Sequence, residues 1–320
     1  MDFYKFRTKE NKNGTTELYP GFIVGRSTDL MVRGGQFYAV WDEEAGLWST
    51  DEYAVARLVD GEMYAEAKDP KHTGRMMVVR SMTEFESTAW SQFKKYISQI
   101  QDNSVILDQS LTFQNDEIKK SDYRSKRLPY ALEPGDVSAW DELVGTLYSA
   151  DERAKIEWII GAIVSGDSKK IQKFGVFYGP PGSGKGTVMD IMHKLFTGYT
   201  TTFEAKQLGS ANAQFALEVF KNYPLLAIQG DGNLSRIADN ARLNSIVSHE
   251  PMTIDAKFKS PVTDIIHTFL VMGTNSPVQI TDAKSGLIRR LIDIHPTGVK
   301  IPINHYMSLI ARTDFELGAI

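Results

Sequence analysis

The second half of the chain alternates short apolar runs with segments of helical periodicity. The apolar runs, which predict buried strands, are residues 174–178, 225–228, 269–272 and 291–294. Apolar residues with helical spacing lie between them at Val188, Ile191, Met192 and Leu195, and again at Leu234, Ile237, Ala238 and Ala241. Short buried strands that alternate with helices are typical of a parallel sheet. The pattern therefore predicts an α/β domain over residues 171–320.

Two amphipathic helices are predicted directly before this domain. Their apolar positions follow the spacing i, i+3, i+4 and i+7. The first set is Trp140, Leu143, Val144 and Leu147, and the second is Ile156, Ile159, Ile160 and Ile163. Pro134 and Gly135 mark a boundary on their N-terminal side. We therefore expect a helical lead-in over residues 136–170.

Residues 1–135 have a mixed pattern. The first 20 residues are polar, which predicts a mobile end, and residues 30–80 are strand-like and rich in turns. Within that stretch, residues 35–48 predict a β-hairpin whose aromatic side chains favour a role in a core over base stacking. A helix is predicted over 85–100, and short strands over 105–107 and 111–113. This region is interpreted as a small mixed α+β accessory domain.

Composition narrows the class of protein. The 320 residues are 42% hydrophobic and 24% charged, as in an ordinary globular protein, and include no cysteine. The lack of cysteine excludes disulfides, thiol catalysis and cysteine-ligated zinc. No apolar stretch approaches the roughly 18 residues that span a bilayer, and the polar N-terminus lacks the apolar core of a secretory signal. We therefore expect no membrane partner and a cytoplasmic location.

A glycine-rich loop carries the strongest chemical signal. It lies between the predicted strand 174–178 and a predicted helix, and reads Gly179, Pro180, Pro181, Gly182, Ser183, Gly184, Lys185, Gly186, Thr187. This spacing is that of a P-loop, in which backbone N–H groups and a helix N-terminus surround phosphate. Lys185 is expected to reach the β- and γ-phosphates of ATP. A glycine-rich turn with a stray lysine is the alternative interpretation.

One position departs from the usual P-loop pattern. The residue after the lysine ordinarily carries a hydroxyl group that holds Mg²⁺, but here it is Gly186. The hydroxyl comes one residue later, at Thr187, so the metal is expected to be held by Thr187 or mostly through water. The same form occurs in nucleotide kinases that resemble adenylate kinase.

Polar residues follow two of the predicted buried strands. Asp231 comes after 225–228, where it is expected to hold the metal, and Asn275 comes after 269–272, where it is expected to orient the attacking water. A turn-forming role is the alternative for each. Asp231 has no acidic neighbour in the sequence, so the general base is left undefined.

Two basic pairs complete the set of candidate residues. Arg289 and Arg290 follow Asn275 and suggest an arginine finger, which stabilises charge on a transferred phosphoryl group; the alternative is a solvated or ion-paired feature. Residues 252–259 alternate strictly, which places Lys257 and Lys259 on the polar face of a strand. They are candidates for contacts with a phosphate backbone, although an ordinary half-exposed strand explains the pattern equally well.

Taken in this order, the motifs resemble superfamily 3 helicases, specifically the ATPase part of phage and poxvirus-type primase-helicases. The resemblance runs from about Val105 to the C-terminus. It rests on the P-loop, on residues 254–259 before a DNA-contacting hairpin, on the sensor strand 271–277 and on the arginine region 289–291. The segment 30–60 is a fainter match to the domain that precedes the ATPase in these proteins.

The resemblance implies an AAA+-type, P-loop NTPase fold that assembles as a ring, usually a hexamer. ATP and Mg²⁺ would bind between subunits, with Lys185 and Asp231 from one subunit and Arg289 or Arg290 from its neighbour. Lys257 would line the pore, and hydrolysis would drive translocation on single-stranded or forked DNA during replication. For a phage protein this places the chain in the bacterial host cytoplasm. Family members usually continue past Ile320, so we expect a shortened or partner-dependent end. No primase motif is evident in the sequence.

Two other functions stay open. A nucleoside monophosphate kinase is supported by the order Gly184, Lys185, Gly186, Thr187, but such kinases place the loop at the N-terminus, and here 178 residues precede it. A ring ATPase that binds origins or packages DNA would share the nucleotide site without unwinding a duplex. The net charge of −4 means that any contact with DNA must be local.

Overall fold

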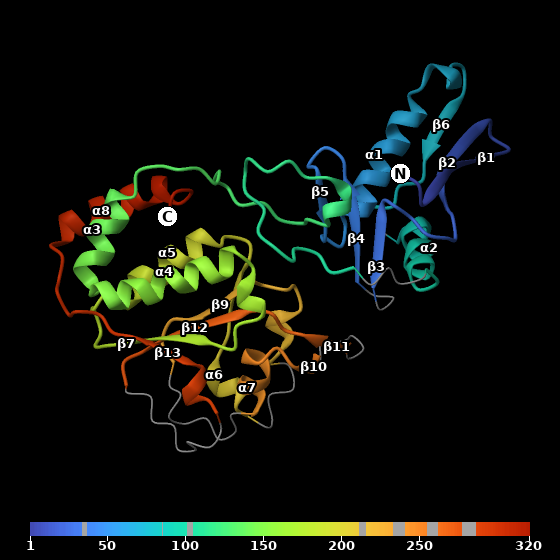
Figure 1. The fold of residues 1–320 in the computed structure, drawn as a ribbon. Helices are drawn as coiled ribbons and strands as arrows, with labels where there is room; N and C mark the ends of the chain where they lie inside the picture. The colour runs from blue at the N-terminus through green and yellow to red at the C-terminus, as the bar shows by residue number, and fades with distance from the viewer. Residues whose placement is uncertain are drawn as a thin grey trace. The chain divides into compact units, whose positions relative to one another are not determined.

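The computed structural model describes residues 1–33, 37–84, 86–100, 105–210, 216–232, 241–254, 262–276 and 286–320. The chain forms two compact units (Figure 1). The N-terminal unit comprises residues 1–107 and 117–125, and the C-terminal unit comprises residues 108–116 and 126–320.

The C-terminal unit is built on a parallel sheet, as the sequence predicts, and this sheet has five strands. Its strands, in spatial order, are β13 (Leu291–Ile294), β7 (Phe174–Tyr178), β12 (Phe269–Thr274), β9 (Leu226–Gln229) and β8 (Thr200–Thr202). Four of them correspond to the predicted apolar runs. β8 was not predicted, because three threonines do not form an apolar run.

Helices cover both faces of this sheet (Figure 1). One layer contains α3 (Ser138–Leu147), α4 (Ala150–Val164), α5 (Lys185–Leu195) and α8 (Ile303–Glu316), and the other contains α6 (Ala205–Leu208) and α7 (Ala241–Val247). Alternate residues of each strand enter opposite cores: Val176 and Leu270 pack in the second layer, and Phe177 and Val271 in the first. The two helices predicted before the sheet are therefore confirmed as α3 and α4.

The last helix is fixed to the first one of the unit. Both carboxylate oxygens of Glu316, at the end of α8, accept hydrogen bonds from the backbone N–H groups of Ala139 and Trp140, each at 2.9 Å. These N–H groups belong to the first turn of α3, where backbone N–H groups have no acceptor within their own helix. α8 thereby closes the layer that carries the glycine-rich loop and α5.

A short hairpin follows α7. β10 (Pro251–Ile254) pairs antiparallel with β11 (Val262–Ile265), with Ile254 opposite Val262. This confirms the first half of the predicted strand 252–259. Lys257 and Lys259 lie outside the described residues, as does most of the helix predicted around 234–241.

The described residues of the N-terminal unit form two small sheets and two α-helices. One sheet has the order β1 (Tyr4–Glu10), β2 (Thr15–Phe22), β6 (Met76–Val79), and the other has the order β3 (Leu30–Arg33), β4 (Phe37–Asp42), β5 (Leu47–Ser49). The helices are α1 (Ala54–Ala67) and α2 (Thr88–Ile97). Trp41 and Trp48 are buried with their ring centroids 5.9 Å apart. Trp41 and Trp48 of the predicted hairpin therefore belong to a core.

Three predictions for this region are wrong. The first 20 residues form the hairpin β1–β2, because Phe3, Tyr4 and Leu18 are buried in the unit's core despite the polar composition. The stretch 30–80 was predicted to be strand-like throughout, but it contains the 14-residue helix α1, which has a buried apolar face. Residues 105–107 and 111–113 are not strands; they are irregular segments in which Leu107, Leu111 and Phe113 are buried.

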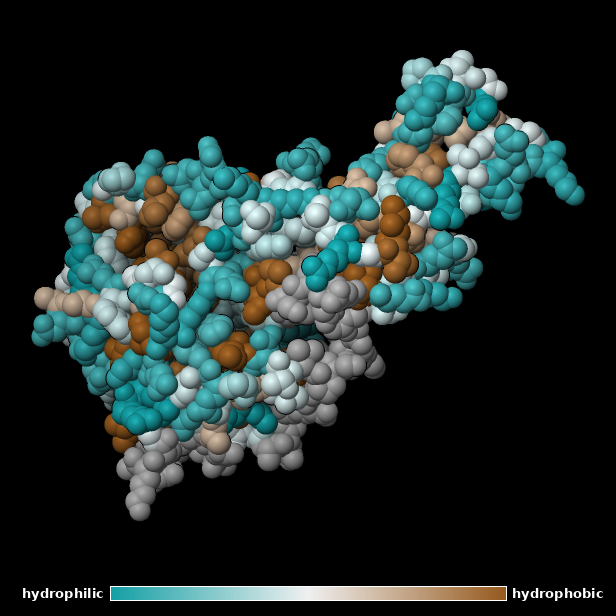
Figure 2. All heavy atoms as spheres, turned by 45° about the vertical axis from the view of Figure 1, so that its right-hand side comes forward, coloured by the Kyte–Doolittle hydropathy of each residue, from teal (hydrophilic) through white to brown (hydrophobic). Residues whose placement is uncertain are grey.

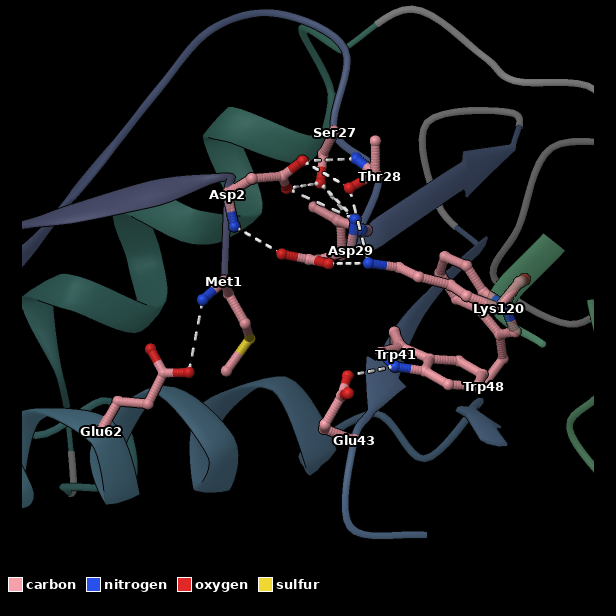
Figure 3. Close-up of polar contacts among 11 residues, drawn as sticks. Met1, Asp2, Ser27, Thr28, Asp29, Trp41, Glu43, Trp48, Glu62 and Lys120 are labelled. Carbon is pink, nitrogen blue, oxygen red and sulfur yellow. Dashed lines mark hydrogen bonds and ion pairs between the residues drawn. The ribbon is translucent and has the colours of Figure 1, made fainter. Parts of the chain in front are cut away.

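Contacts of the first two residues explain why the N-terminus is ordered (Figure 3). The Asp2 carboxylate accepts hydrogen bonds from the Thr28 backbone N–H at 2.6 Å and from the Ser27 hydroxyl group. Partial burial opposes the charge, but these hydrogen bonds outweigh it and lower the pKa of Asp2 to about 2. The terminal amine lies 3.3 Å from Glu62 on α1, and Lys120 pairs with Asp29.

No helix among the described residues is long and apolar enough to cross a bilayer. The face shown in Figure 2 is largely hydrophilic, with hydrophobic side chains scattered between polar ones.

Candidate nucleotide-binding site

The candidate residues gather where parallel strands end at one edge of the sheet. Tyr178 at the end of β7 pairs with Thr274 on β12, Met272 pairs with Gln229 on β9, and Ile228 pairs with Thr202 on β8. The first or second residues beyond these strand ends therefore leave the sheet side by side. They are Gly179 after β7, Asn275 after β12, Asp231 after β9 and Glu204 after β8. Such an edge is where α/β sheets bind ligands.

The glycine-rich loop joins β7 to α5, as the sequence predicts. Gly182 and Gly184 have φ angles of 74° and 94°, a region that glycine enters without strain. A Cβ atom on Gly184 would also approach the Leu147 side chain to 2.9 Å. α5 begins at Lys185, so its unpaired N–H groups and positive dipole end face the loop. The loop therefore presents backbone donors to an anion.

Lys185 is turned back over this loop. It is 8% exposed, and its Nζ atom donates to the carbonyl oxygens of Gly179 at 2.5 Å and Pro180 at 2.9 Å, and to Oδ1 of Asn275 at 2.9 Å. Burial lowers the pKa of the Lys185 ammonium, and the charge of Asp231 offsets part of that effect. A buried cation that is held by neutral oxygens has a strong electrostatic preference for an anionic partner.

Asn275 connects this lysine to Asp231. Its Nδ2 atom donates to both carboxylate oxygens of Asp231 at 3.4 Å, while its Oδ1 atom accepts from Lys185. The backbones of β12 and β9 approach closely here, since a Cβ atom on Gly273 would lie 2.4 Å from the Gly230 carbonyl oxygen. The structure thus brings three predicted residues together, in the order Lys185, Asn275, Asp231.

A cavity of about 890 Å³ opens beside Asp231 and Asn275, at the ends of β8, β9 and β12. Among the described residues that line it, two are carboxylates: Asp231 and Glu204. Sequence reasoning missed Glu204 because β8 was not recognised. The available signal was the β-branched run 200–202, which is followed by an acidic residue before the next helix.

A second cavity, of about 520 Å³, adjoins the glycine-rich loop. The loop residues 182–187 form one wall, and the remaining lining residues are Leu147, Val299, Lys300, Ile301, Ile303 and Tyr306. The hydroxyl groups of Thr187 and Tyr306 are 3.0 Å apart. Thr187 therefore faces this cavity while Asp231 lines the first one, and the structure does not bring these two predicted metal ligands together.

The two arginines differ sharply in their surroundings. Arg290 is 7% exposed, and its guanidinium donates to the Ser248 hydroxyl group at 2.6 Å and to the Gly286 carbonyl oxygen at 3.0 Å. Burial, together with the neighbouring charge of Arg289, lowers the pKa of Arg290. Arg289 is exposed, and its side chain makes no hydrogen bond or ion pair with the described part of the chain. Neither arginine lines the two cavities.

Comparisons with known proteins match the same region. The model of a family of unknown function (DUF5906) matches residues 177–290, from the end of β7 to Arg290. No curated protein matches the sequence significantly.

Solved structures resemble a larger part of the chain. The apo structure of the NrS-1 C terminal region (305–718) has a TM-score of 0.54 at 13% identity, over 91% of this chain and 65% of that one. An A form apo structure of the same region has a TM-score of 0.52 at 14% identity, over 89% and 63%. A JCV helicase with a bound acetamide compound has a TM-score of 0.38 at 15% identity, over 56% of this chain and 48% of that one. The chain thus has the fold of the NrS-1 C-terminal region and spans less than two thirds of its length.

Proposed function

We propose that the C-terminal unit binds and hydrolyses ATP with Mg²⁺, and that the chain is the motor part of a ring-forming helicase acting on single-stranded or forked DNA. The observation that carries the proposal is the link from Lys185 through Asn275 to Asp231, at the mouth of a glycine-rich loop. At one edge of the sheet, Lys185 supplies a cation for phosphate, Asn275 an amide for water, and Asp231 a carboxylate for the metal.

The triphosphate lies over the loop in this proposal. Its β- and γ-phosphate oxygens replace the Gly179, Pro180 and Asn275 oxygens as partners of Lys185, and backbone N–H groups at the start of α5 bind the same anion. Charge-assisted hydrogen bonds to phosphate are stronger than those to neutral carbonyls. Lys185 therefore gains stronger hydrogen bonds when it exchanges the protein oxygens for phosphate oxygens, which favours ATP binding.

The second cavity suits the base of the nucleotide. Its apolar wall and the ring of Tyr306 offer a surface against which a flat purine can stack, and the cavity directly adjoins the loop. Lys185 lines this cavity and also contacts Asn275, which lines the first. A nucleotide with its base beside Tyr306 would therefore direct its γ-phosphate toward Asn275 and Asp231.

The residues fit a metal that is held largely through water. Asp231 offers the carboxylate oxygens that Mg²⁺ prefers, while Thr187 is engaged with Tyr306. When bound, Mg²⁺ would neutralise charge on the β- and γ-phosphates. Asn275 would hold the attacking water through its amide group.

Sharing of the site between subunits is supported by the arginines. Arg290 is committed to Ser248 and Gly286, whereas the exposed Arg289 has no partner among the described residues and lies outside both cavities of its own chain. We assign Arg289 as the residue offered to a neighbouring subunit in a hexamer. Lys257 and Lys259, in the segment between β10 and β11, are proposed to contact DNA.

The proposal is tested by measuring ADP formation with ATP alone, with single-stranded DNA and with AMP, followed by strand displacement on a forked duplex. Stimulation by DNA and displacement of the strand are expected. DNA-stimulated hydrolysis without displacement would favour the ring ATPase that does not unwind. ADP formation that requires AMP would identify a nucleotide kinase instead.

A further inference from the structure

One acidic residue that lines the first cavity has no role in the nucleotide or metal binding proposed above. Glu204 follows β8 and lines the cavity of about 890 Å³ together with Asp231 and Asn275. Thr202 pairs with Ile228 in the parallel sheet, so Glu204 leaves its strand two residues beyond the pair and Asp231 three residues beyond. Two carboxylates that follow adjacent strands therefore line the same cavity.

The backbone around Glu204 is held in place. The N–H group of Ala205 donates to Oε1 of Gln229 at 2.9 Å, which ties the start of α6 to the end of β9. Ala205 itself is 1% exposed. Glu204 thus stands on a fixed point of the sheet edge, as a positioned catalytic group requires.

A hydrogen bond orients the Glu204 carboxylate through one of its two oxygens. Gln207 donates from Nε2 to its Oε2 atom at 2.7 Å, and Oε1 takes no hydrogen bond from the described residues. No cation among those residues forms an ion pair with it. Asp231, in contrast, has both oxygens turned to the amide of Asn275, on the side of Lys185. The two carboxylates therefore suit different roles.

We propose that Glu204 is the general base of the hydrolysis, an assignment that rests on the proposed ATPase function. Glu204 removes a proton from the water that Asn275 holds, while the water oxygen attacks the γ-phosphorus atom. The bond from that phosphorus to the β–γ bridging oxygen breaks, and its electron pair leaves with ADP. The proton on Glu204 then passes to solvent, which restores the carboxylate. Asp231 would hold the metal through its carboxylate oxygens.

The test compares Glu204→Gln with wild-type protein and with Glu218→Gln, a matched change at a surface glutamate that pairs with Lys221. General-base catalysis typically contributes 10²–10⁴-fold, so kcat of Glu204→Gln is expected to fall by at least about 100-fold. Its affinity for a fluorescent ATP analogue should stay within about threefold of wild type, since the base makes no ground-state contact with phosphate. The nucleotide recovered from Glu204→Gln protein should be ATP rather than ADP.

Two results would overturn the assignment. Turnover of Glu204→Gln close to that of wild type would show that another group takes the proton. Parallel loss of ATP binding and turnover would make Glu204 a binding or structural residue. If wild-type protein bound no ATP and formed no ADP even with DNA, the proposed function itself would fail, and the assignment with it.

Discussion

The Nζ atom of Lys185 lies 2.9 Å from Oδ1 of Asn275, which binds Asp231 through the other end of its amide. One side chain therefore touches both the residue assigned to phosphate and the residue assigned to metal. Arrival of a γ-phosphate would draw Lys185 away and leave the amide free to hold water. The hydrogen-bond partners of Asn275 would therefore differ between the nucleotide-free and the ATP-bound site.

Replacement of Asn275 should affect catalysis more than binding. Loss of one polar group that stabilises a phosphoryl transition state costs about 10²–10³-fold in kcat, and we expect a fall of that order for Asn275→Ala with a smaller change in KM. Steady-state ATP hydrolysis measures both. Ser276→Ala, which alters the same cavity lining, serves as the control. Unchanged kcat in Asn275→Ala would remove the amide from the reaction.

The two arginines should separate in function. Arg289→Ala is expected to lose ATP turnover without loss of stability, because its side chain has no partner in the described part of its own chain. Arg290→Ala should instead lower the free energy of unfolding by about 1–3 kcal/mol, since it leaves the partly buried Ser248 hydroxyl group and Gly286 carbonyl oxygen without their hydrogen-bond donor. Urea unfolding and ATP turnover distinguish the two.

Mixing variants tests whether the site is shared. Protein carrying Arg289→Ala, mixed with Asp231→Ala protein, should regain part of the turnover, because one kind of interface in a mixed ring contains both intact residues. Failure to recover activity at every mixing ratio would argue for a site complete within one chain.

Tyr306 should affect affinity for the nucleotide. Stacking of a base on an aromatic ring contributes about 1–3 kcal/mol, so Tyr306→Ala is expected to raise the Kd for ATP by roughly tenfold. Tyr306→Phe keeps the ring and should remain close to wild type. Met307→Ala, an exposed neighbour on α8, is the control for the helix. Equal affinities in all three variants would contradict the assignment of the base to this cavity.

Stability should decrease in mild acid because of His267. Burial, with the nearby charges of His249 and Lys169, lowers the pKa of His267 below its ordinary 6.5, and Asp264 opposes this only in part. The unfolded chain thus binds the proton more readily, so stability is lost as pH falls below about 6.5. Urea unfolding at pH 7.5 and 5.5 should show a smaller loss for His267→Gln than for wild type. An equal loss in His267→Gln and in the exposed control His305→Gln would exclude this origin.

Most of the sheet could be predicted because its inner strands are buried on both faces and are therefore continuously apolar. β8 could not, since a three-residue edge strand of threonines carries no such signal, and Glu204 was missed with it. The ordered N-terminus was missed for a related reason: six of the seven residues of β1 are exposed, and the strand is held by Phe3, Tyr4 and the contacts of Asp2.

The details of the site depended on tertiary contacts. The sequence indicates Thr187 as a metal ligand by its place in the loop, but only the packing of α8 shows that Tyr306 engages it. Arg289 and Arg290 are equivalent in sequence, and the partner Ser248 is 42 residues away along the chain. The surroundings of Thr187, Arg289 and Arg290 are thus determined by contacts between residues that lie far apart in the sequence.

The most direct test of the central claim is ATP turnover in the presence of single-stranded DNA, for wild type, Lys185→Ala and Lys194→Ala. Lys194 lies on the same helix and pairs with Asp314 at the surface, so its variant should behave as wild type. Turnover of Lys185→Ala should fall by at least about 100-fold, because the variant lacks the cation that is proposed to bind the β- and γ-phosphates. Near-normal turnover in Lys185→Ala would contradict the account.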